Sequence, residues 1–493
     1  MQSGYFRERQ RYTKAEIAAN LGRPVDTVID ILRKLKSSGV LKAVRSSLSG
    51  IDFKELQDND FVVSDVDIDS PSQLFVFDYV GVVTVGSCIF KIFPKYIKNQ
   101  TDLLTQLQQV LKVIRRYNAK VQTISMTNGL DLQEPFNMLP IMMFLVSDYI
   151  ENGVYVNIRD ITEINGEGEI DWVRTVNEID PYISNRHPVY AELITTQSIE
   201  DERDYFRRLH RCIAASCYAA LKVEELDVLF SLPSEISCEE EITDFGEKDY
   251  ILYRLKREMN LQFITRKQML LRTMYAFISQ HKASPDAMSF SMYGTNCFNL
   301  IWEKVCTEVF GNVLLKVISR LPVPLAEEFV IRNNSALIDL IKRPIWTAFL
   351  AGGDEEHHRT KDTLIPDIVS IYIKGGEPCF GIFDAKYYTI KLDANGVYNQ
   401  PGIGDITKQY LYQLAFNTFI RAHKFAHVQN AFLLPTSDEQ ASACGKVSLN
   451  ILESLPTNPK LSDILAVELP ARQMYAWYLD GRTISINNEF PML

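Results

Sequence analysis

The sequence predicts a mixed α/β fold built from three parts, and three patterns support this prediction. A helix, turn, helix and strand pattern occupies the first 45 residues. Short apolar strands and long helical stretches follow, and a strand, turn, strand pattern between helical segments lies nearer the C-terminus. We therefore expect an N-terminal domain over residues 1–60, a strand-rich and helical middle region over 74–280, and a C-terminal domain over 281–493 whose central mixed sheet is flanked by helices.

The first part has the pattern of a winged helix-turn-helix. Thr13 and Glu16 have the spacing of a capping box at the start of one helix, and Pro24 opens the next. The second helix of such a domain commonly enters a major groove of DNA. Basic residues on or beside it are therefore candidate phosphate contacts: Arg23, Arg33, Lys34 and Lys36. Asp26 and Asp30 on the same helix favour protein contact instead, and the sequence leaves both interpretations open.

The composition is that of a globular protein and limits the classes of function. Hydrophobic residues make up 46% of the chain and charged residues 23%. The net charge is −10, so any contact with DNA must come from local basic patches. The apolar stretch over 138–146 is too short to span a bilayer, and the N-terminus has no apolar signal core. The eight cysteines form no Cys-x-x-Cys pair, and we expect reduced thiols in a cytoplasmic protein without a membrane partner.

The strongest chemical signal is a pair of aspartates on two apolar segments that read as a β-hairpin. The turn signal between them centres on Gly375-Gly376. Counting outward from that turn places Asp367 opposite Asp384, and directly opposed strand residues have Cβ atoms about 4.5–5.5 Å apart. Lys386 is two residues after Asp384, so both project from the same face of their strand. Two carboxylates and one amine would therefore converge on one spot.

These residue types favour metal-assisted hydrolysis of a phosphodiester bond. Carboxylate oxygens are hard ligands that suit Mg²⁺, and the metal would supply Lewis acidity. Lys386 would hold or deprotonate a water beside the metal. The alternative is an ordinary surface hairpin whose charges are solvated. The strand around Asp384 is strongly apolar, however, and a charged pair inside such a strand is costly unless it has a partner or a metal.

Pro366-Asp367 together with Asp384-Ala385-Lys386 resembles the motif of the PD-(D/E)-x-K nuclease superfamily. The resemblance implies that Asp367 and Asp384 bind the metal and that Lys386 is catalytic. It also implies that an acid on a neighbouring helix completes the metal shell. Glu303, beside the apolar stripe of a helix expected over 296–317, is the candidate for this third ligand, and its alternative is a solvated glutamate. Many relatives carry Glu where this chain has Asp384, and either residue ligates Mg²⁺.

A further helix is expected to begin near residue 404, and it carries two glutamines. Gln409 and Gln413 share one face at a spacing of four residues. Gln413 is a candidate catalytic residue because these amides could steer DNA or the attacking water. The alternative is that both are polar surface residues. The Gln-x-x-x-Tyr signature of exonuclease-like branches of the superfamily is not matched here.

Several segments together resemble the LlaJI family of restriction endonucleases, which is similar to McrC, the nuclease subunit of a methylcytosine-dependent restriction system. The segments are Val80-Gly81-Val82, Phe93-Pro94-Lys95-Tyr96, Gly166–Thr175 (expected to be a loop that runs into a strand), Pro366–Tyr388 and the helix with Gln413. The resemblance implies a subunit of a restriction or phage-defence system that cuts double-stranded DNA with Mg²⁺ when a separate McrB-like AAA+ GTPase drives it. The middle region over 74–280 would then dock this partner or DNA. The chain has no Gly-x-x-x-x-Gly-Lys-[Ser/Thr] loop, which agrees with a motor on another chain.

Two other functions compete with this interpretation. One is a winged-helix DNA-binding regulator whose nuclease fold is inactive. The intact set of Asp367, Asp384 and Lys386 argues against it, because a decayed site would usually have lost a member. The other is a repair exonuclease coupled to a helicase, which the missing Gln-x-x-x-Tyr pattern disfavours.

Overall fold

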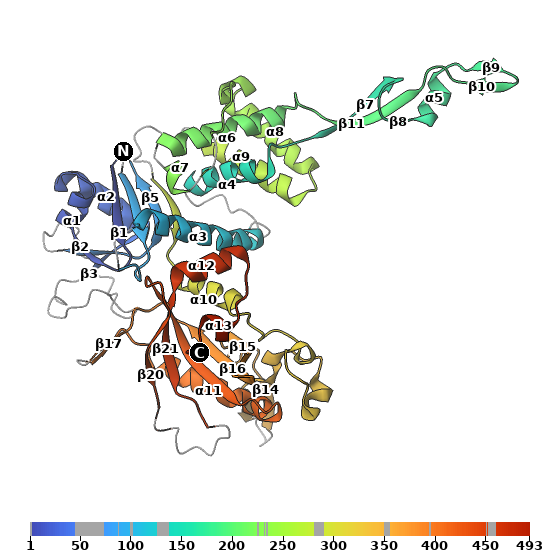
Figure 1. Ribbon diagram of the computed structural model, residues 1–493. Helices are drawn as coiled ribbons and strands as arrows, with labels where there is room; N and C mark the ends of the chain where they lie inside the picture. The colour runs from blue at the N-terminus through green and yellow to red at the C-terminus, as the bar shows by residue number, and fades with distance from the viewer. Residues whose placement is uncertain are drawn as a thin grey trace. The chain divides into compact units, whose positions relative to one another are not determined.

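The computed structural model describes most of the chain, and its contacts divide it into two compact units (Figure 1). The described residues are 2–44, 73–86, 88–98, 102–125, 138–223, 226–230, 232, 235–280, 290–349, 355–393, 396–449, 451 and 460–493. The first unit consists of residues 1–132 and 293–493, and the second of residues 133–292. Residues 45–60 of the predicted N-terminal domain lie outside the described residues. The three-part division expected from the sequence is not tested by this grouping and stays a prediction.

The first unit begins with two short strands and two helices. These are β1 (Gln2–Arg7), β2 (Arg11–Thr13), α1 (Lys14–Asn20) and α2 (Val25–Ser37), followed by β3 (Leu41–Val44) and β4 (Leu74–Phe77). The predicted capping box is confirmed, because the Thr13 side chain accepts from the Glu16 N–H while Glu16 accepts from the Thr13 N–H. Strands β2, β4 and β3 form a three-stranded sheet beside these helices. The assignment of this segment to the winged-helix class stays a prediction.

A second sheet has the strand order β1-β6-β5-β12. The further strands are β5 (Val80–Val85), β6 (Cys88–Phe93) and β12 (Phe290–Thr295), and helix α3 (Leu103–Ser125) packs against β5 and β6. Strands β1 and β6 run parallel, so the N-terminal strand is an integral part of this sheet. Gly81 is required where β5 crosses β12, because a Cβ there would lie 2.2 Å from the carbonyl oxygen of Tyr293.

The C-terminal sheet has five strands in the order β15-β16-β19-β21-β20. They are β15 (Ile368–Lys374), β16 (Glu377–Ala385), β19 (His427–Thr436), β20 (Ser442–Val447) and β21 (Ile464–Pro470). The three central strands run parallel, and β15 and β20 are antiparallel edges. The predicted central mixed sheet is therefore present, and the mixed α/β class is confirmed.

Helices cover both faces of this sheet. On one face α11 (Ile403–Ala422) shares a core with β15 and β16 that includes Phe416, Val369 and Phe380. Side chains alternate along a strand, so Phe383 points to the other face, where its ring lies 5.4 Å from that of Phe310. Phe310 ends α10 (Phe298–Val309), which packs against α12 (Ala471–Asp480). The sheet therefore has an α11 face and an α10 face.

Smaller elements complete the first unit. They are the hairpins β13 (Ile345–Phe349) with β14 (Glu355–Arg359) and β17 (Lys391–Asp393) with β18 (Gly396–Tyr398), the 3₁₀ turns η5 (Ile318–Arg320), η6 (Glu327–Arg332) and η7 (Leu337–Leu340), and α13 (Ile486–Glu489). The helix expected over 296–317 is shorter than predicted. It stops at Val309, because Gly311 has a φ of 65° that ends the regular backbone.

The second unit has a helical part and an extended part. The helical part consists of α4 (Met138–Asn152), α6 (Tyr205–Val223), α7 (Leu226–Leu229), η4 (Ile242–Phe245), α8 (Lys248–Leu261) and α9 (Thr265–Gln280). The extended part, which we call the arm (residues 158–200), consists of β7 (Ile158–Ile164), β8 (Glu169–Ile170), α5 (Trp172–Glu178), β9 (Tyr182–Ser184), β10 (His187–Val189) and β11 (Ile194–Glu200). Figure 1 shows β7 and β11 leading from the helices toward β9 and β10.

The loop over residues 166–176 does run into a strand, but that strand is only β8 (Glu169–Ile170), and its expected continuation is wrong because Trp172–Glu178 form helix α5. Asp171 starts this helix by accepting a hydrogen bond from the Arg174 N–H at 3.0 Å. Its N-cap role therefore overrides the β-propensity of the valines that follow. All eight cysteines, which lie in described parts of the chain, are free thiols. No helix among the described residues has both the length and the apolar character needed to cross a bilayer.

Candidate functional site

The β15–β16 hairpin carries the two predicted aspartates at its open end. Gly375 and Gly376 have φ values of 61° and 88°, the pattern of a two-residue type I′ turn that most residues would adopt only with strain. Pairing starts with Lys374 opposite Glu377 and continues to Ile368 opposite Phe383. The next pair in this register is Asp367 and Asp384. The predicted hairpin and its register are confirmed.

Both carboxylates lie on the α11 face of the sheet. Asp367 is two residues before Val369, which packs on α11, and Asp384 is two residues after Ile382, which does the same. Oδ2 of Asp367 accepts a hydrogen bond from the Ala385 N–H at 3.1 Å, which fixes it across the strand end. Asp384 is only 7% exposed. The two acids are thus side by side and largely removed from water.

Lys386 lies directly after β16 and bridges two carboxylates. Its Nζ is 2.9 Å from Oδ2 of Asp384 and 3.1 Å from Oδ1 of Asp405. Its backbone N–H donates to the Leu433 carbonyl at 3.0 Å. Asp405 was not identified from the sequence. It lies in the first turn of α11, where any helix favours an acid, so its position gave no signal of a site.

The electrostatics of the cluster are those of crowded like charges. Burial raises the pKa of Asp367 well above the ordinary aspartate value, and its hydrogen bond with Asp384 and the charge of that carboxylate raise it further. Burial alone would lower the pKa of Lys386. The carboxylates of Asp384 and Asp405 outweigh that effect and raise it. The lysine therefore stays protonated at neutral pH and acts as a fixed positive charge, so of the two roles expected from the sequence only holding a water is favoured.

Glu303 lies near this cluster without a described contact to it. Burial raises the pKa of its carboxyl group, and the charge of Asp384 adds to the effect. Its neighbourhood is therefore neither that of a fully solvated glutamate nor that of a residue bonded to the two aspartates. Its role as a third metal ligand stays a prediction.

The two glutamines of α11 do not join the cluster. Gln413 is buried, and its amide donates to the Lys460 carbonyl at 3.2 Å and accepts from the Ser462 N–H at 3.1 Å. Gln409 is fully buried as well. Gln413 thus holds the segment that leads into β21, and its catalytic role stays a prediction. The alternative of a surface residue is wrong for both.

The donor set suits a cation that needs few protein ligands. Among the described residues, no three His, Cys, Asp or Glu side chains are arranged to hold a metal ion. Mg²⁺ is commonly bound by one or two carboxylates, with substrate oxygens and water as its other ligands. Asp367 and Asp384 offer two adjacent carboxylates, and burial together with the neighbouring Asp384 carboxylate raises the pKa of Asp367. The residues present therefore fit Mg²⁺ chemically.

The predicted DNA contacts lie on α2 and the turn before it. Nε of Arg23 donates to Oε1 of Gln2 at 2.6 Å. Arg33 pairs with Asp30 at 2.9 Å, and this exposed pair offsets its charge. Lys34 is exposed and Lys36 is half-buried. A role for these four basic residues in binding DNA stays a prediction.

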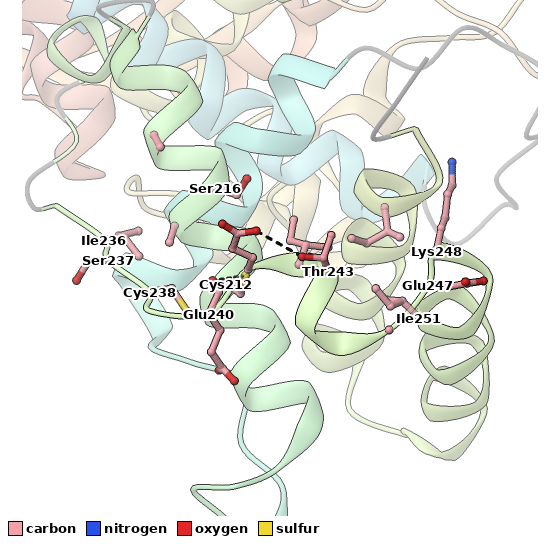
Figure 2. Close-up of a pocket in the computed structure, with 16 residues that line it drawn as sticks. Cys212, Ser216, Ile236, Ser237, Cys238, Glu240, Thr243, Glu247, Lys248 and Ile251 are labelled. Carbon is pink, nitrogen blue, oxygen red and sulfur yellow. Dashed lines mark hydrogen bonds between the residues drawn. The ribbon is translucent and has the colours of Figure 1, made fainter. Parts of the chain in front are cut away.

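A cavity of 940 Å³ lies in the second unit, and none of the predicted site residues lines it. Figure 2 shows it between α6 and the segment before α8, with Cys212 beside Glu240. The Thr243 hydroxyl donates a hydrogen bond to the carboxylate of Glu241. The other walls of the cavity are mainly small or apolar side chains, and Lys248 donates to the Ser279 carbonyl. Its acidic character does not suit a phosphate backbone, so phosphodiester chemistry is better placed at the end of β16.

A family model decides which group of proteins the chain falls in. The model of the LlaJI restriction endonuclease matches residues 79–337 and 329–472, which is more than half of the chain. The chain belongs to the LlaJI restriction endonuclease family. Membership of this family implies nuclease activity.

The chain is also similar to one curated relative and to two solved assemblies. The component YdjA of the type II restriction enzyme BsuMI of Bacillus subtilis (strain 168) is 28% identical over 501 residues, which cover 100% of this chain and 92% of the relative. A half-complex of Thermococcus gammatolerans McrB AAA+ hexamers with bound McrC matches at 12% identity and a TM-score of 0.35, covering 97% of this chain and 99% of that one. The McrBC complex of the same organism matches at 13% identity and a TM-score of 0.25, covering 61% and 85%. Both TM-scores are below 0.5, so neither likeness carries an argument.

Proposed function

We propose that this chain is the Mg²⁺-dependent DNA-cleaving subunit of a restriction system. The observation that carries the proposal is the convergence of Asp367, Asp384 and Lys386 at the end of β16 in a chain of the LlaJI family. The competing regulator with a dead site is disfavoured, because the lysine and both acids are held together.

Each residue of the cluster has a distinct role in this proposal. Asp367 and Asp384 would hold Mg²⁺, which when bound supplies Lewis acidity toward the phosphate and lowers the pKa of a bound water. Lys386, kept protonated by Asp384 and Asp405, would donate hydrogen bonds to the attacking water and to phosphate oxygens on which charge develops. Asp405 holds that amine in place from α11. Glu303 is retained as a candidate third ligand.

The decisive test is cleavage of plasmid DNA by the full-length chain. The chain is combined with the product of an adjacent AAA+ gene, Mg²⁺, and GTP or ATP. We expect cleavage that needs Mg²⁺ and disappears in Lys386→Ala and Asp384→Ala. Cleavage at the wild-type rate by both variants would place the chemistry elsewhere. Cleavage by the chain without any nucleotide-hydrolysing subunit would refute the motor requirement alone.

We also propose that a McrB-like AAA+ GTPase subunit is the partner and that the arm is its docking surface. The similar BsuMI chain is named as one component of a restriction enzyme, which supports action together with other chains. The arm exposes many large apolar side chains: Ile158, Ile164, Trp172, Val173, Tyr182 and Ile183. We expect Trp172→Ala with Val173→Ala to weaken co-purification of the AAA+ subunit while the unfolding temperature stays unchanged. Undiminished co-purification would exclude this surface.

The basic residues of α2 are proposed to contact DNA phosphates. Each lost phosphate contact lowers the slope of log affinity against log salt by about 0.9. We expect Arg33→Ala with Lys34→Ala to flatten that slope by about 2. An unchanged slope together with loss of the AAA+ subunit would assign this helix to protein contact.

A further inference from the structure

The residue that follows Lys386 is anchored on the opposite side of the strand. Tyr387 is buried, and its Oη donates a hydrogen bond to Oε2 of Glu8 at 2.5 Å. Glu8 follows β1 at the N-terminal end of the chain and is 4% exposed. A buried bond therefore joins residues 379 positions apart, directly beside the proposed catalytic lysine.

Lys95 closes this contact into a three-residue cluster. Its backbone N–H lies 3.2 Å from Oε2 of Glu8 and 3.3 Å from Oη of Tyr387. Its Nζ lies 4.7 Å from the centre of the Tyr387 ring. Lys95 belongs to the segment Phe93-Pro94-Lys95-Tyr96, which the sequence marked as typical of the family without indicating a role.

The surroundings of the cluster keep the Tyr387 hydroxyl a hydrogen-bond donor. The rings of Phe298 and Tyr96 lie 5.3 and 6.3 Å from the Tyr387 ring and shield it from water. Burial raises the pKa of Tyr387, and the charge of Glu8 raises it further. Burial also raises the pKa of Glu8, although Lys95 opposes the effect. Removing Glu8 would leave the buried Tyr387 hydroxyl without this acceptor, whereas the Lys95 N–H would keep its bond to Oη of Tyr387.

Lys386 is consequently fixed from two directions. Its own N–H is bonded to the Leu433 carbonyl, which also accepts from Nε1 of Trp302 at 3.0 Å. The next side chain is tied to Glu8, so the backbone on either side of the Lys386 Cα is held. With the backbone fixed, the amine has little freedom to leave the space between Asp384 and Asp405.

We propose that Glu8 and Tyr387 are positioning residues of the nuclease site, and that the N-terminal segment thereby completes that site. The proposal rests on the proposed function for its effect on cleavage, but its structural part concerns only the place of the Lys386 amine. A tyrosine that merely fills the core would tolerate loss of its hydroxyl without any change at Lys386. The Glu8–Tyr387 bond predicts that the same loss frees the amine.

The first measurement is the reactivity of Lys386 in the full-length chain. Competitive labelling with an amine-selective reagent at one fixed pH, read by mass spectrometry, reports the access to a single lysine. In Tyr387→Phe we expect Lys386 to label at least threefold faster than in the wild type. Glu8→Ala should behave alike, and Glu8→Gln, which keeps an acceptor oxygen, should stay within twofold of the wild type.

Tyr372→Phe is the matched control. Its Oη donates to the Leu493 carbonyl at 2.8 Å, so it loses a tyrosine hydrogen bond in the same sheet without a path to Lys386. Labelling unchanged in Tyr387→Phe, or raised equally in Tyr372→Phe, would overturn the proposal. A general loss of stability would raise the labelling of Lys386 in both Tyr387→Phe and Tyr372→Phe.

The second measurement separates this proposal from the proposed function. In single-turnover cleavage by the complete complex we expect Tyr387→Phe to be slower by about tenfold or more at unchanged DNA affinity, because a misplacement of about 1 Å can cost about a hundredfold. If Lys386→Ala cleaves normally while labelling still responds to Tyr387→Phe, the positioning stands and the nuclease assignment fails. If Lys386→Ala is inactive while Tyr387→Phe cleaves and labels like the wild type, the positioning fails alone.

Discussion

Two buried polar clusters, one in each unit, differ in how well their charges are matched. In the second unit Asp148 accepts two hydrogen bonds from the Arg266 guanidinium, at 3.0 and 2.8 Å, and one from Asn152 at 3.0 Å. Beside it, Tyr155 donates its backbone N–H to His210 at 3.0 Å and its hydroxyl to Glu258 at 2.9 Å. The charges of Asp148 and Arg266 are thus paired, and these bonds tie α4, α6, α8 and α9 together.

The cluster at the end of β16 is arranged in the opposite way. Asp384 and Asp405 share one amine, Lys386, and Asp367 lies beside Asp384. Burial raises the pKa of Asp367, and its hydrogen bond with Asp384 and the charge of that carboxylate raise it further. The pair in the second unit has its charges matched within the chain, whereas the proposed Mg²⁺ would complete the cluster at the end of β16 from outside. The comparison teaches that the two buried clusters are distinguished by their charge balance and not by their burial.

The sharpest way to break the comparison is to remove one aspartate. Asp367→Ala and Asp384→Ala should each lower cleavage by more than about a hundredfold, since the loss of even an outer partner of a metal ligand costs about 10–100-fold. Single-turnover plasmid cleavage measures the effect. Asp463→Ala, an exposed aspartate paired with Lys446, is the matched control and should cleave normally. Cleavage activity retained in Asp367→Ala would show that the crowded carboxylates at the end of β16 have no catalytic role.

The matched cluster should respond in stability instead. Arg266→Met leaves the Asp148 carboxylate, which is 7% exposed, without its main partner. The expected loss is about 3 kcal/mol in the free energy of unfolding, typical of breaking a buried pair. This loss is measured by urea denaturation, with unfolding monitored by hydrogen exchange of the backbone amides in α4. Arg482→Met, which breaks an exposed pair with Glu489, should change stability by less than about 1 kcal/mol. Equal effects of the two variants would contradict the contrast.

Asp405 tests whether the lysine needs both of its anchors. Asp405→Ala leaves the Lys386 amine with Asp384 alone, and its pKa should fall because one of the two carboxylates that raise it is gone. We expect cleavage to slow by about tenfold, equal to about 1.4 kcal/mol of transition-state stabilisation. DNA affinity should stay unchanged. The cleavage rate of Asp405→Asn, which keeps an acceptor oxygen, should lie between those of the wild type and Asp405→Ala. Cleavage at the wild-type rate by Asp405→Ala would show that Asp405 is not part of the site.

The smallest expected effect has the opposite sign to the others. Without divalent ions, Asp367→Asn should stabilise the first unit by about 1 kcal/mol, because it removes one of two crowded charges. The pKa of Asp367 is raised on folding, so its contribution to stability is fully present below the ordinary aspartate pKa and is lost as pH rises through the raised value. The gain in the variant should therefore be larger at pH 8 than at pH 5. Adding Mg²⁺ should stabilise only the wild type, and an equal response of both proteins would contradict a metal at Asp367.

Because of His210, the stability of the second unit should depend on pH in the direction opposite to that expected from Asp367 in the first unit. Burial lowers the pKa of His210 to about 4, so the neutral ring is the folded form. Its contribution to stability is present above the ordinary histidine pKa and is lost as pH falls toward 4. Acid should thus weaken the matched cluster while it relieves the mismatched one. Hydrogen exchange of the amides in α6 and in α11, measured at pH 5 and pH 8, compares the two clusters in one experiment.

Short sequence patterns predicted much of this site because its two aspartates lie on a single hairpin. Gly375-Gly376 fixes a two-residue turn, and counting from that turn alone pairs Asp367 with Asp384. Capping chemistry likewise predicted the start of α1 at Thr13. The N-cap at Asp171 was not recognised in the sequence, and the start of α5 was therefore missed.

Contacts that depend on packing between distant segments could not be read in this way. Helical spacing showed that Gln409 and Gln413 share a face, but it did not show that this face is buried. Asp405 meets Lys386 only because α11 docks on the sheet, and Glu8 meets Tyr387 only because β1 joins β6 at the other end of the chain. The sequence therefore predicted which acids are opposed, whereas the groups that hold Lys386 required the fold.

The two-residue turn of the β15–β16 hairpin also determines where the chain tolerates changes of length. Side chains alternate with a period of two, so one residue added at Gly375-Gly376 would turn every side chain of β15 to the other face, Asp367 included. Such an insertion, at the opposite end of the hairpin from the two acids, would separate them as completely as a substitution. Homologous chains should therefore vary in length in surface loops but keep this turn at two residues, and its length is as much a part of the site as the aspartates it aligns.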